Sequence, residues 1–127
     1  MDIKEKTILL IEDSNSTRLA YRKAFEDYGF QVLEAENGTQ GWEKVQHYNP
    51  DLVVLDLILP DMHGLEVLQK IRINKFTTDI PVLVLTDVKE AEEVQKTMDL
   101  GASFYAYKGN VTPEKTIKII NQLLKKI

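Results

Sequence analysis

The chain has 127 residues, of which 43% are hydrophobic, a formal net charge of −4 and no cysteine. This length and composition favour one folded domain and exclude a disordered chain. The mild negative charge argues against direct binding to nucleic acid or to a membrane surface. The lack of cysteine excludes disulfides and thiol chemistry. Neither a signal peptide nor a membrane span is visible, so we expect a cytoplasmic protein.

Short apolar runs alternate with amphipathic stretches along the chain. The runs predict strands at residues 7–11, 30–35, 52–55, 80–85 and 103–107. The stretches between and after them predict helices at about 14–28, 39–48, 64–74, 89–100 and from Thr112-Pro113 onward. Five such units favour an α/β fold, a flavodoxin-like (βα)5 three-layer sandwich with a parallel sheet in the order 2-1-3-4-5. We expect one domain over residues 1–127, with its core at about 7–124.

The helical spacing also predicts which side chains face the core. On the first helix the expected inward residues are Leu19, Ala20, Ala24, Phe25 and Tyr28. On the fourth helix they form only a thin stripe of Ala91, Val94 and Met98, which suggests a mobile element. On the last helix they are Ile117, Ile120, Leu124 and Ile127.

Acidic side chains follow the first and third predicted strands. Glu12 and Asp13 come directly after the first, and Asp56 follows the third. Because these strands are neighbours in the order 2-1-3-4-5, the three carboxylates should converge at the switch point of the sheet. Their mutual repulsion needs a cation, and a set of oxygen ligands suits Mg²⁺. A carboxylate beside such an ion can act as a nucleophile toward phosphorus and form an acyl phosphate.

Two further strand ends carry groups that suit phosphoryl oxygens. Thr86 follows the fourth strand and Lys108 the fifth, and they would supply a hydroxyl and a cation. Each residue alone has an ordinary explanation, such as a helix cap for Asp56 or a surface position for Lys108. Their joint occurrence at four strand ends favours a functional site. The two histidines, His47 and His63, are expected at the surface and not as ligands.

The chain resembles the receiver domain of bacterial two-component response regulators. The likeness rests on ILLIED at residues 8–13, LDLILP at 55–60, GLE at 64–66, PVLVLT at 81–86, GAS at 101–103 and Lys108. It covers nearly the whole chain, from about residue 7 to 124. The set of motifs is specific, although no single motif would be.

The resemblance implies a role for each matching residue. Asp56 would accept the phosphoryl group, and Asp13 would bind Mg²⁺ directly, while Glu12 would hold the ion mainly through water. The backbone carbonyl of Ile58 would be a further ligand, and Mn²⁺ would be able to substitute for Mg²⁺. Lys108 would pair with the phosphoryl oxygens.

The resemblance also implies a switch. Thr86 would move toward the phosphate and the ring of Tyr105 would turn inward, reshaping the face made by the fourth helix, fifth strand and fifth helix. The implied partners are a sensor histidine kinase or phosphotransfer protein and an unknown downstream effector or output domain. Homodimerisation through this face is common in the family.

The sequence departs from the family pattern at two sites. Gly109 follows Lys108 where proline is usual, which predicts a trans peptide bond and a loop of different shape. Asp87 follows Thr86 where a small residue is usual, and places another carboxylate near the phosphoryl site. The apolar Ile58 and Val88 take the variable positions that flank the phosphate, so we expect slow hydrolysis of the phosphoaspartate.

Three functions fit these residues. The leading one is a signalling domain that accepts phosphate on Asp56 from a histidine kinase, with at most self-phosphorylation from small donors and slow autodephosphorylation, and not an enzyme that turns over substrate. The second is a receiver-like adaptor that binds its partner independently of phosphorylation, supported by Asp87 and Gly109. The third, a Mg²⁺-dependent phosphatase, is disfavoured because Ile58 stands where such enzymes carry a second aspartate.

Overall fold

Five parallel strands form a single sheet in the structure, a computed structural model that describes residues 6–125. The strands are β1 (Thr7–Ile11), β2 (Gln31–Ala35), β3 (Leu52–Leu55), β4 (Val82–Thr86) and β5 (Phe104–Tyr107). Their order across the sheet is β2-β1-β3-β4-β5. The predicted flavodoxin-like fold is thereby confirmed, with strand ends that differ from the expected ones by a residue or two.

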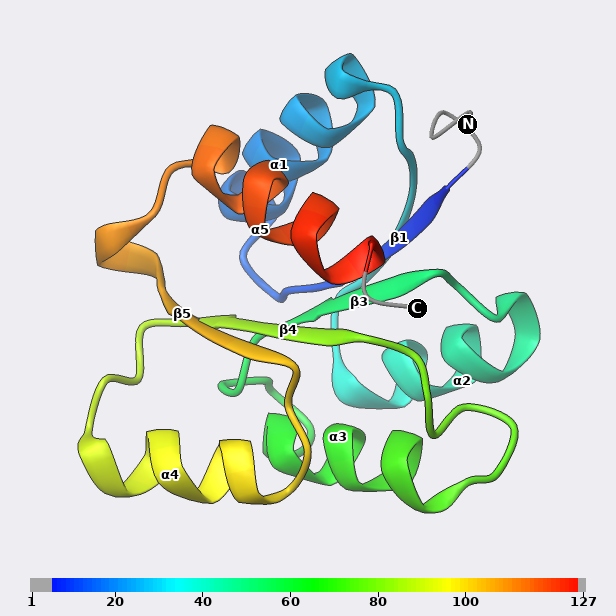
Figure 1. Ribbon diagram of the computed structural model, residues 1–127, viewed down its shortest axis with the longest axis vertical. Helices are drawn as coiled ribbons and strands as arrows, with labels where there is room; N and C mark the ends of the chain where they lie inside the picture. Colours follow the sequence, from blue (N-terminus) through cyan, green and yellow to red (C-terminus); the bar gives the residue numbers. More distant parts are fainter. Residues whose placement is uncertain (1–5, 126–127) are drawn as a thin grey trace.

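Helices cover both faces of the sheet and make the three layers (Figure 1). One face carries α1 (Asn15–Tyr28) and α5 (Pro113–Leu124). The other carries α2 (Gly38–Tyr48), α3 (Gly64–Ile73) and α4 (Ala91–Asp99). A single 3-10 turn, Lys108–Asn110, links β5 to α5. None of the helices within residues 6–125 is both long and apolar enough to cross a membrane.

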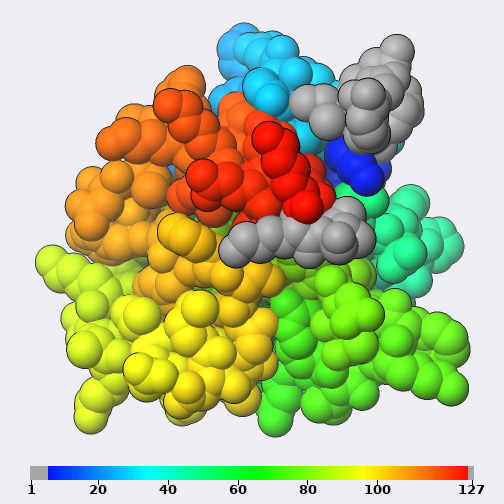
Figure 2. Space-filling model, in the orientation of Figure 1, coloured from blue at the N-terminus to red at the C-terminus, as the bar shows by residue number. Residues whose placement is uncertain are grey.

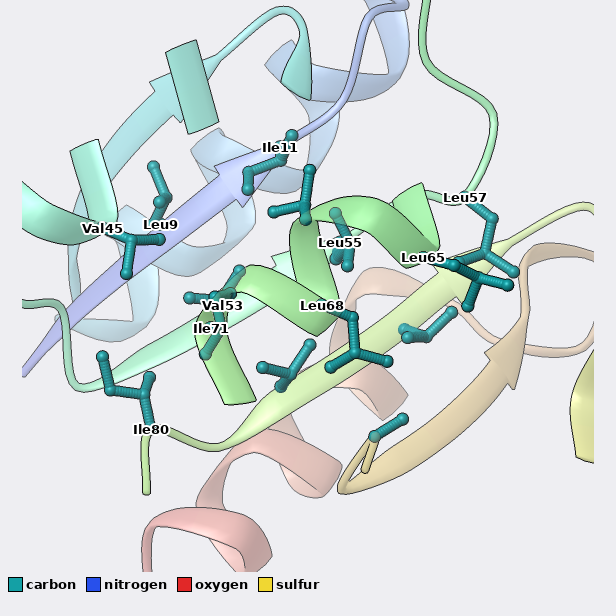
Figure 3. Packing of buried hydrophobic residues seen from close by; sticks show 14 of the residues in the cluster. Leu9, Ile11, Val45, Val53, Leu55, Leu57, Leu65, Leu68, Ile71 and Ile80 are labelled. Atoms are coloured by element: carbon teal, nitrogen blue, oxygen red, sulfur yellow. The ribbon is translucent and has the colours of Figure 1, made fainter. Parts of the chain in front are cut away.

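The core lies in two layers because the central strands are buried on both sides. Every residue of β3 and of β4 is buried, as expected for parallel strands between helices. On one face Leu65, Leu68 and Ile71 of α3 belong to the same buried cluster as Val53 and Leu55 of β3 (Figure 3). This packing fixes α3 against the strand that leads to Asp56.

The inward face of α1 differs from the prediction. Phe25 is buried as expected and Ala24 is half-buried, but Leu19 is 62% exposed and Ala20 and Tyr28 also face solvent. Tyr21 is buried instead and stacks edge-to-face on Phe25. Residues four apart share one face of a helix, so the row containing Tyr21 and Phe25 meets the sheet and Leu19 points away.

The predicted stripe of α4 is also wrong in detail. Ala91 is exposed, Met98 is 38% exposed and Val94 is half-buried. The one buried residue of the helix is Thr97, whose hydroxyl donates a hydrogen bond of 2.7 Å to the carbonyl of Glu93. That bond satisfies the threonine within its own helix, so α4 buries a small polar side chain where we expected apolar ones.

The last helix follows the prediction more closely. Ile117 and Ile120 are buried and Leu124 is half-buried, while Ile127 lies outside the described residues. The expected cap is present, since the Thr112 hydroxyl accepts a hydrogen bond from the Lys115 amide at 3.1 Å. Pro113 occupies the first turn, where its missing N–H costs nothing.

Candidate functional site

Three carboxylates meet where β1 and β3 end. Ile11 pairs with Leu55 in the sheet, and the Asp56 amide donates to the Ile11 carbonyl at 3.1 Å, which places the two strand ends side by side. One oxygen from each of Glu12, Asp13 and Asp56 lies within 4.8 Å of the others. Glu12 and Asp56 are buried, whereas Asp13 is exposed. The sheet thus gathers the acidic residues that the sequence places after separate strands.

Lys108 supplies a positive charge to this cluster from the end of β5. Its Nζ donates to Glu12 Oε1 at 2.6 Å and to Asp56 Oδ2 at 2.9 Å. Burial by itself would lower the pKa of Lys108, but the two hydrogen-bonded carboxylates outweigh it and raise that pKa. Lys108 is therefore a fixed cation at neutral pH.

The charge of Lys108 does not fully compensate Glu12. Burial raises the pKa of Glu12, and the hydrogen bond from Lys108 only partly opposes this effect, while the charge of Asp56 adds to it. One ammonium group is shared by two buried carboxylates, and a third carboxylate stands beside them. The cluster therefore favours a further cation.

The loop after Asp56 is held tightly by the start of α3. The Ile58 amide donates to Asp56 Oδ1 at 3.2 Å, and the Gly64 amide donates to the Leu57 carbonyl at 2.7 Å. A Cβ added at Gly64 would overlap the Asp56 carbonyl oxygen and would lie 2.6 Å from Leu57 Cα. Only glycine allows this close approach, which fixes the backbone around the expected phosphoacceptor.

Thr86 and Tyr105 meet at one residue of the β4–α4 loop. The fully buried hydroxyl of Thr86 accepts a long hydrogen bond of 3.4 Å from the Val88 amide. The Tyr105 hydroxyl donates to the Val88 carbonyl at 2.6 Å. Burial raises the pKa of Tyr105, and nearby carboxylates add to that effect. The two expected switch residues therefore hydrogen-bond to the amide and to the carbonyl of Val88.

A hollow of about 260 Å³ opens over the acidic cluster. Its lining includes the three carboxylates, Lys108 and Ile58, together with Ser14 and Thr17, which sequence reasoning did not assign to the site. Asp87 is exposed and lines the same hollow, so the unusual residue does lie beside the cluster. Thr86 lies beneath the surface and not in this lining.

The peptide bond after Lys108 has the trans form expected from the missing proline. No peptide bond among residues 6–125 is cis, so Lys108–Gly109 is trans.

A larger hollow, of about 560 Å³, lies at the opposite edge of the sheet, with Pro81, Phe76 and Leu123 in its walls. Its lining also includes Lys6, Asp51, Lys75 and Asp79, but among the described residues the group of three acidic side chains close enough to hold a metal ion lies at the smaller hollow.

Two residues have structural roles that their sequence positions do not reveal. His63, expected at the surface, caps α3: its Nδ1 accepts from the Leu65 amide at 3.1 Å, and the His63 amide donates to Glu66 Oε2 at 3.3 Å. Arg18 reaches from α1 to the carbonyl of Glu12 at 2.7 Å. A helical arginine gives no sequence signal of such a contact.

Comparisons with known proteins agree with this geometry. Residues 8–121 match the family model of the response regulator receiver domain. The chain is 33% identical over 95 residues to sporulation initiation phosphotransferase F of Bacillus subtilis, covering 75% of each. It also resembles a solved receiver domain of Methanospirillum hungatei, with a TM-score of 0.89 and 25% identity over 96% of this chain and 95% of that one.

Other relatives are longer. The chain is 34% identical over 103 residues to the phosphate regulon transcriptional regulatory protein PhoB of Pseudomonas aeruginosa, which is 81% of this chain and 45% of that protein. It spans 31% of a protein-glutamate methylesterase of Paramagnetospirillum magneticum. This chain belongs to the response regulator receiver domain family, the signalling domains of two-component systems.

Proposed function

We propose that residues 7–124 act as one receiver domain that accepts a phosphoryl group on Asp56. The observation that carries this proposal is the meeting of Asp56 with Glu12, Asp13 and Lys108 in one hollow. An oxygen of the Asp56 carboxylate attacks phosphorus, and the bond from phosphorus to the donor's histidine nitrogen breaks. The electron pair leaves with the imidazole, which takes a proton from water.

The donor set fits Mg²⁺, as is general for receiver domains. Asp13 and Asp56 would hold the ion with the Ile58 carbonyl, and Glu12 would hold it mainly through water. When bound, Mg²⁺ or Mn²⁺ supplies positive charge that offsets repulsion between the carboxylates and the incoming phosphoryl oxygens. Lys108 already donates a hydrogen bond to Asp56. Its Nζ could therefore bind an oxygen of a phosphoryl group attached to Asp56.

Phosphorylation would be read out through Val88. In the described conformation the Thr86 hydroxyl is occupied by the Val88 amide through a weak bond. The Thr86 O–H can itself donate, so it would turn toward a phosphoryl oxygen, which is a strong acceptor, and release the Val88 amide. Tyr105 would then lose its present geometry at the Val88 carbonyl, and α4 would shift.

The surface changed by this shift would be formed by α4, β5 and α5. Figure 2 shows α4 in yellow and α5 in orange to red on one face of the molecule. Receiver domains interact with histidine kinases and with effector domains. For this chain we propose a histidine kinase or phosphotransfer protein as donor and an effector or a second copy at this face. A cytoplasmic location would accord with such partners.

The test is phosphorylation with acetyl phosphate, followed by mass spectrometry of the intact protein. We expect a single added phosphoryl group that requires Mg²⁺, and none in Asp56→Asn. Asp61→Asn is the matched control, because Asp61 lies in the same loop but bonds to Gly38 and Thr39 of α2. Equal labelling of Asp56→Asn and wild type would overturn the proposal.

Asp87 gives specific support to a second candidate, an adaptor whose partner binding does not depend on phosphate. This residue lines the hollow that the phosphoryl group would enter. If Asp87 repels the donor, Asp87→Ala should phosphorylate several-fold faster than wild type. The adaptor is favoured if wild type fails to be labelled under conditions in which Asp87→Ala is labelled, or if a partner binds equally with and without beryllofluoride.

A further inference from the structure

Arg18 of α1 bonds to the segment after β1, to β2 and to the start of its own helix. Its side chain is only 11% exposed, and each part of the guanidinium has its own partner. Nη1 donates to the Glu12 carbonyl at 2.7 Å, Nε to Glu34 Oε1 on β2 at 3.0 Å, and Nη2 to Asn15 Oδ1 at 2.6 Å. Because the guanidinium is planar and rigid, these three bonds define its orientation.

The hydrogen bond from Arg18 to the Glu12 carbonyl lies just beyond the end of β1. β1 ends at Ile11 and α1 begins at Asn15, so the residues between them lack a regular ladder. The Glu12 amide still donates to the Ala35 carbonyl at 3.0 Å, and the Glu12 carbonyl accepts from Arg18. That carbonyl shares a peptide plane with the Asp13 amide, so fixing it sets the direction in which Asp13 leaves the backbone.

We propose that Arg18 is the positioning residue that orients Glu12 and Asp13 for Mg²⁺, an inference that rests on the function proposed above. Among the described residues, Arg18 makes no hydrogen bond to the carboxylates of Glu12, Asp13 or Asp56. It acts through the backbone of Glu12, anchored by Glu34. Partners of this kind around a metal site commonly change metal affinity by about 10- to 100-fold when they are removed.

Arg22 offers a matched control from the same helix. Its Nη1 donates to the other oxygen of Glu34, Oε2, at 2.8 Å, but among the described residues its guanidinium has no hydrogen bond to Glu12. Arg18→Ala and Arg22→Ala each remove one positive charge and one ion-pair partner of Glu34. They differ in the bonds to the Glu12 carbonyl and to Asn15, which Arg18 makes, and in burial, since the Arg18 side chain is 11% and the Arg22 side chain 44% exposed.

The sign of the effect separates positioning from simple electrostatics. Removing a cation from the neighbourhood of a metal site lowers the repulsion felt by Mg²⁺, so charge alone predicts tighter binding in Arg18→Ala. Loss of positioning predicts weaker binding. Arg18→Lys keeps the charge but cannot reproduce a three-way planar fork, so it should bind Mg²⁺ nearly as weakly as Arg18→Ala.

The experiment titrates the unphosphorylated protein with MgCl₂ by calorimetry, with the melting temperature in EDTA as a check of folding. We expect the Mg²⁺ dissociation constant to rise about tenfold or more in Arg18→Ala and Arg18→Lys and to change less than about threefold in Arg22→Ala. In acetyl phosphate labelling, Arg18→Lys should need more Mg²⁺ but reach nearly the wild-type rate at saturation.

Each other result overturns the inference. Wild-type affinity in Arg18→Lys, tighter binding in Arg18→Ala, or an equal loss in Arg22→Ala would each exclude positioning through the Glu12 carbonyl. If Arg18→Ala does not fold, Arg18→Lys decides alone. If wild type itself binds no Mg²⁺ and takes up no phosphoryl group, the proposed function fails, which is a different result from failure of the Arg18 variants alone.

Discussion

Helices α3 and α4 cover the same face of the sheet, yet they are held very differently (Figure 1). α3 buries Leu65, Val67, Leu68 and Ile71 and starts with a reciprocal capping box. α4 buries only Thr97, and its N-cap residue Glu90 makes no side-chain cap bond. The helix that follows the expected phosphoacceptor is thus firmly packed, whereas the helix that follows Thr86 is loosely attached. A switch needs this division, because a rigid site can bias a neighbour only if that neighbour can move.

Core truncation should show the contrast most strongly. Leu68→Ala in α3 removes a fully buried side chain, so the free energy of unfolding should fall by about 2–5 kcal/mol. Val94→Ala in α4 removes a half-buried one and should cost about 1 kcal/mol or less. Urea denaturation followed by circular dichroism measures both. Equal losses would show that α4 is packed as tightly as α3.

Hydrogen exchange should reveal the same difference without mutation. We expect the central amides of α4 to exchange on the order of 100-fold faster than those of α3, because α4 can open without breaking a large apolar contact. Mass spectrometry of peptic fragments gives both rates in one experiment. Similar protection in the two helices would remove the basis for treating α4 as the mobile element.

The caps allow the contrast to be reduced by design. Glu90→Ser would give α4 a side chain that can accept from its first-turn amides and should add about 0.5–1 kcal/mol to stability. His63→Ala would remove the α3 cap and should cost about 1 kcal/mol. Thermal melts of the two variants give these values. If α4 is the moving element, Glu90→Ser should also slow its hydrogen exchange, whereas faster exchange would argue against this view.

The smallest effect is expected at Asp61, which ties the loop before α3 to α2. Hydrogen bonds from the Thr39 hydroxyl, and from the Gly38 and Thr39 amides, lower the pKa of Asp61 from 3.8 to about 2. Because the folded pKa lies below the unfolded one, its contribution is complete above about pH 4 and disappears as the pH falls through 2. The carboxylate is exposed, so this contribution should not exceed about 1 kcal/mol.

Asp61→Asn provides the corresponding measurement. Melting temperatures of wild type and variant should differ near pH 6 and converge as the pH falls below 2, where Asp61 becomes protonated and both side chains are uncharged. A difference that stays constant with pH would mean that the carboxylate charge contributes nothing to the anchor. Phosphorylation of the variant near pH 7 should remain, since Asp61 lies outside the acidic cluster.

The sequence predicted the fold well because its central strands are short and largely apolar, and β3 and β4 are buried throughout. Residues 52–55 carry no polar side chain, and such a run leaves few options besides a central parallel strand. The gathering of Glu12, Asp13 and Asp56 followed from the strand order alone. Their roles as metal ligands and phosphoacceptor stay predictions, as do those of Thr86, Lys108 and Tyr105, until the labelling experiments are done.

The inward faces of the outer helices were harder to predict. Leu19 and Tyr21 are both apolar enough for a core, and the pattern does not say which of them the sheet will meet. In α4 the buried position is taken by Thr97, whose hydroxyl finds its partner within the helix. Periodicity reports where apolar side chains stand along a helix, but the direction in which the helix docks depends on distant residues.

The sequence by itself determined the order of strands and helices, the parallel sheet and the edge at which the acidic residues collect. Those properties depend on local apolar runs and on short connections, which a single stretch of chain can encode. Only the tertiary structure decided that Lys108 reaches Glu12 as well as Asp56, and that Arg18 and Gly64 hold the two loops of the site. These contacts join residues whose neighbours in sequence say nothing about them, because they form only when separate elements pack together.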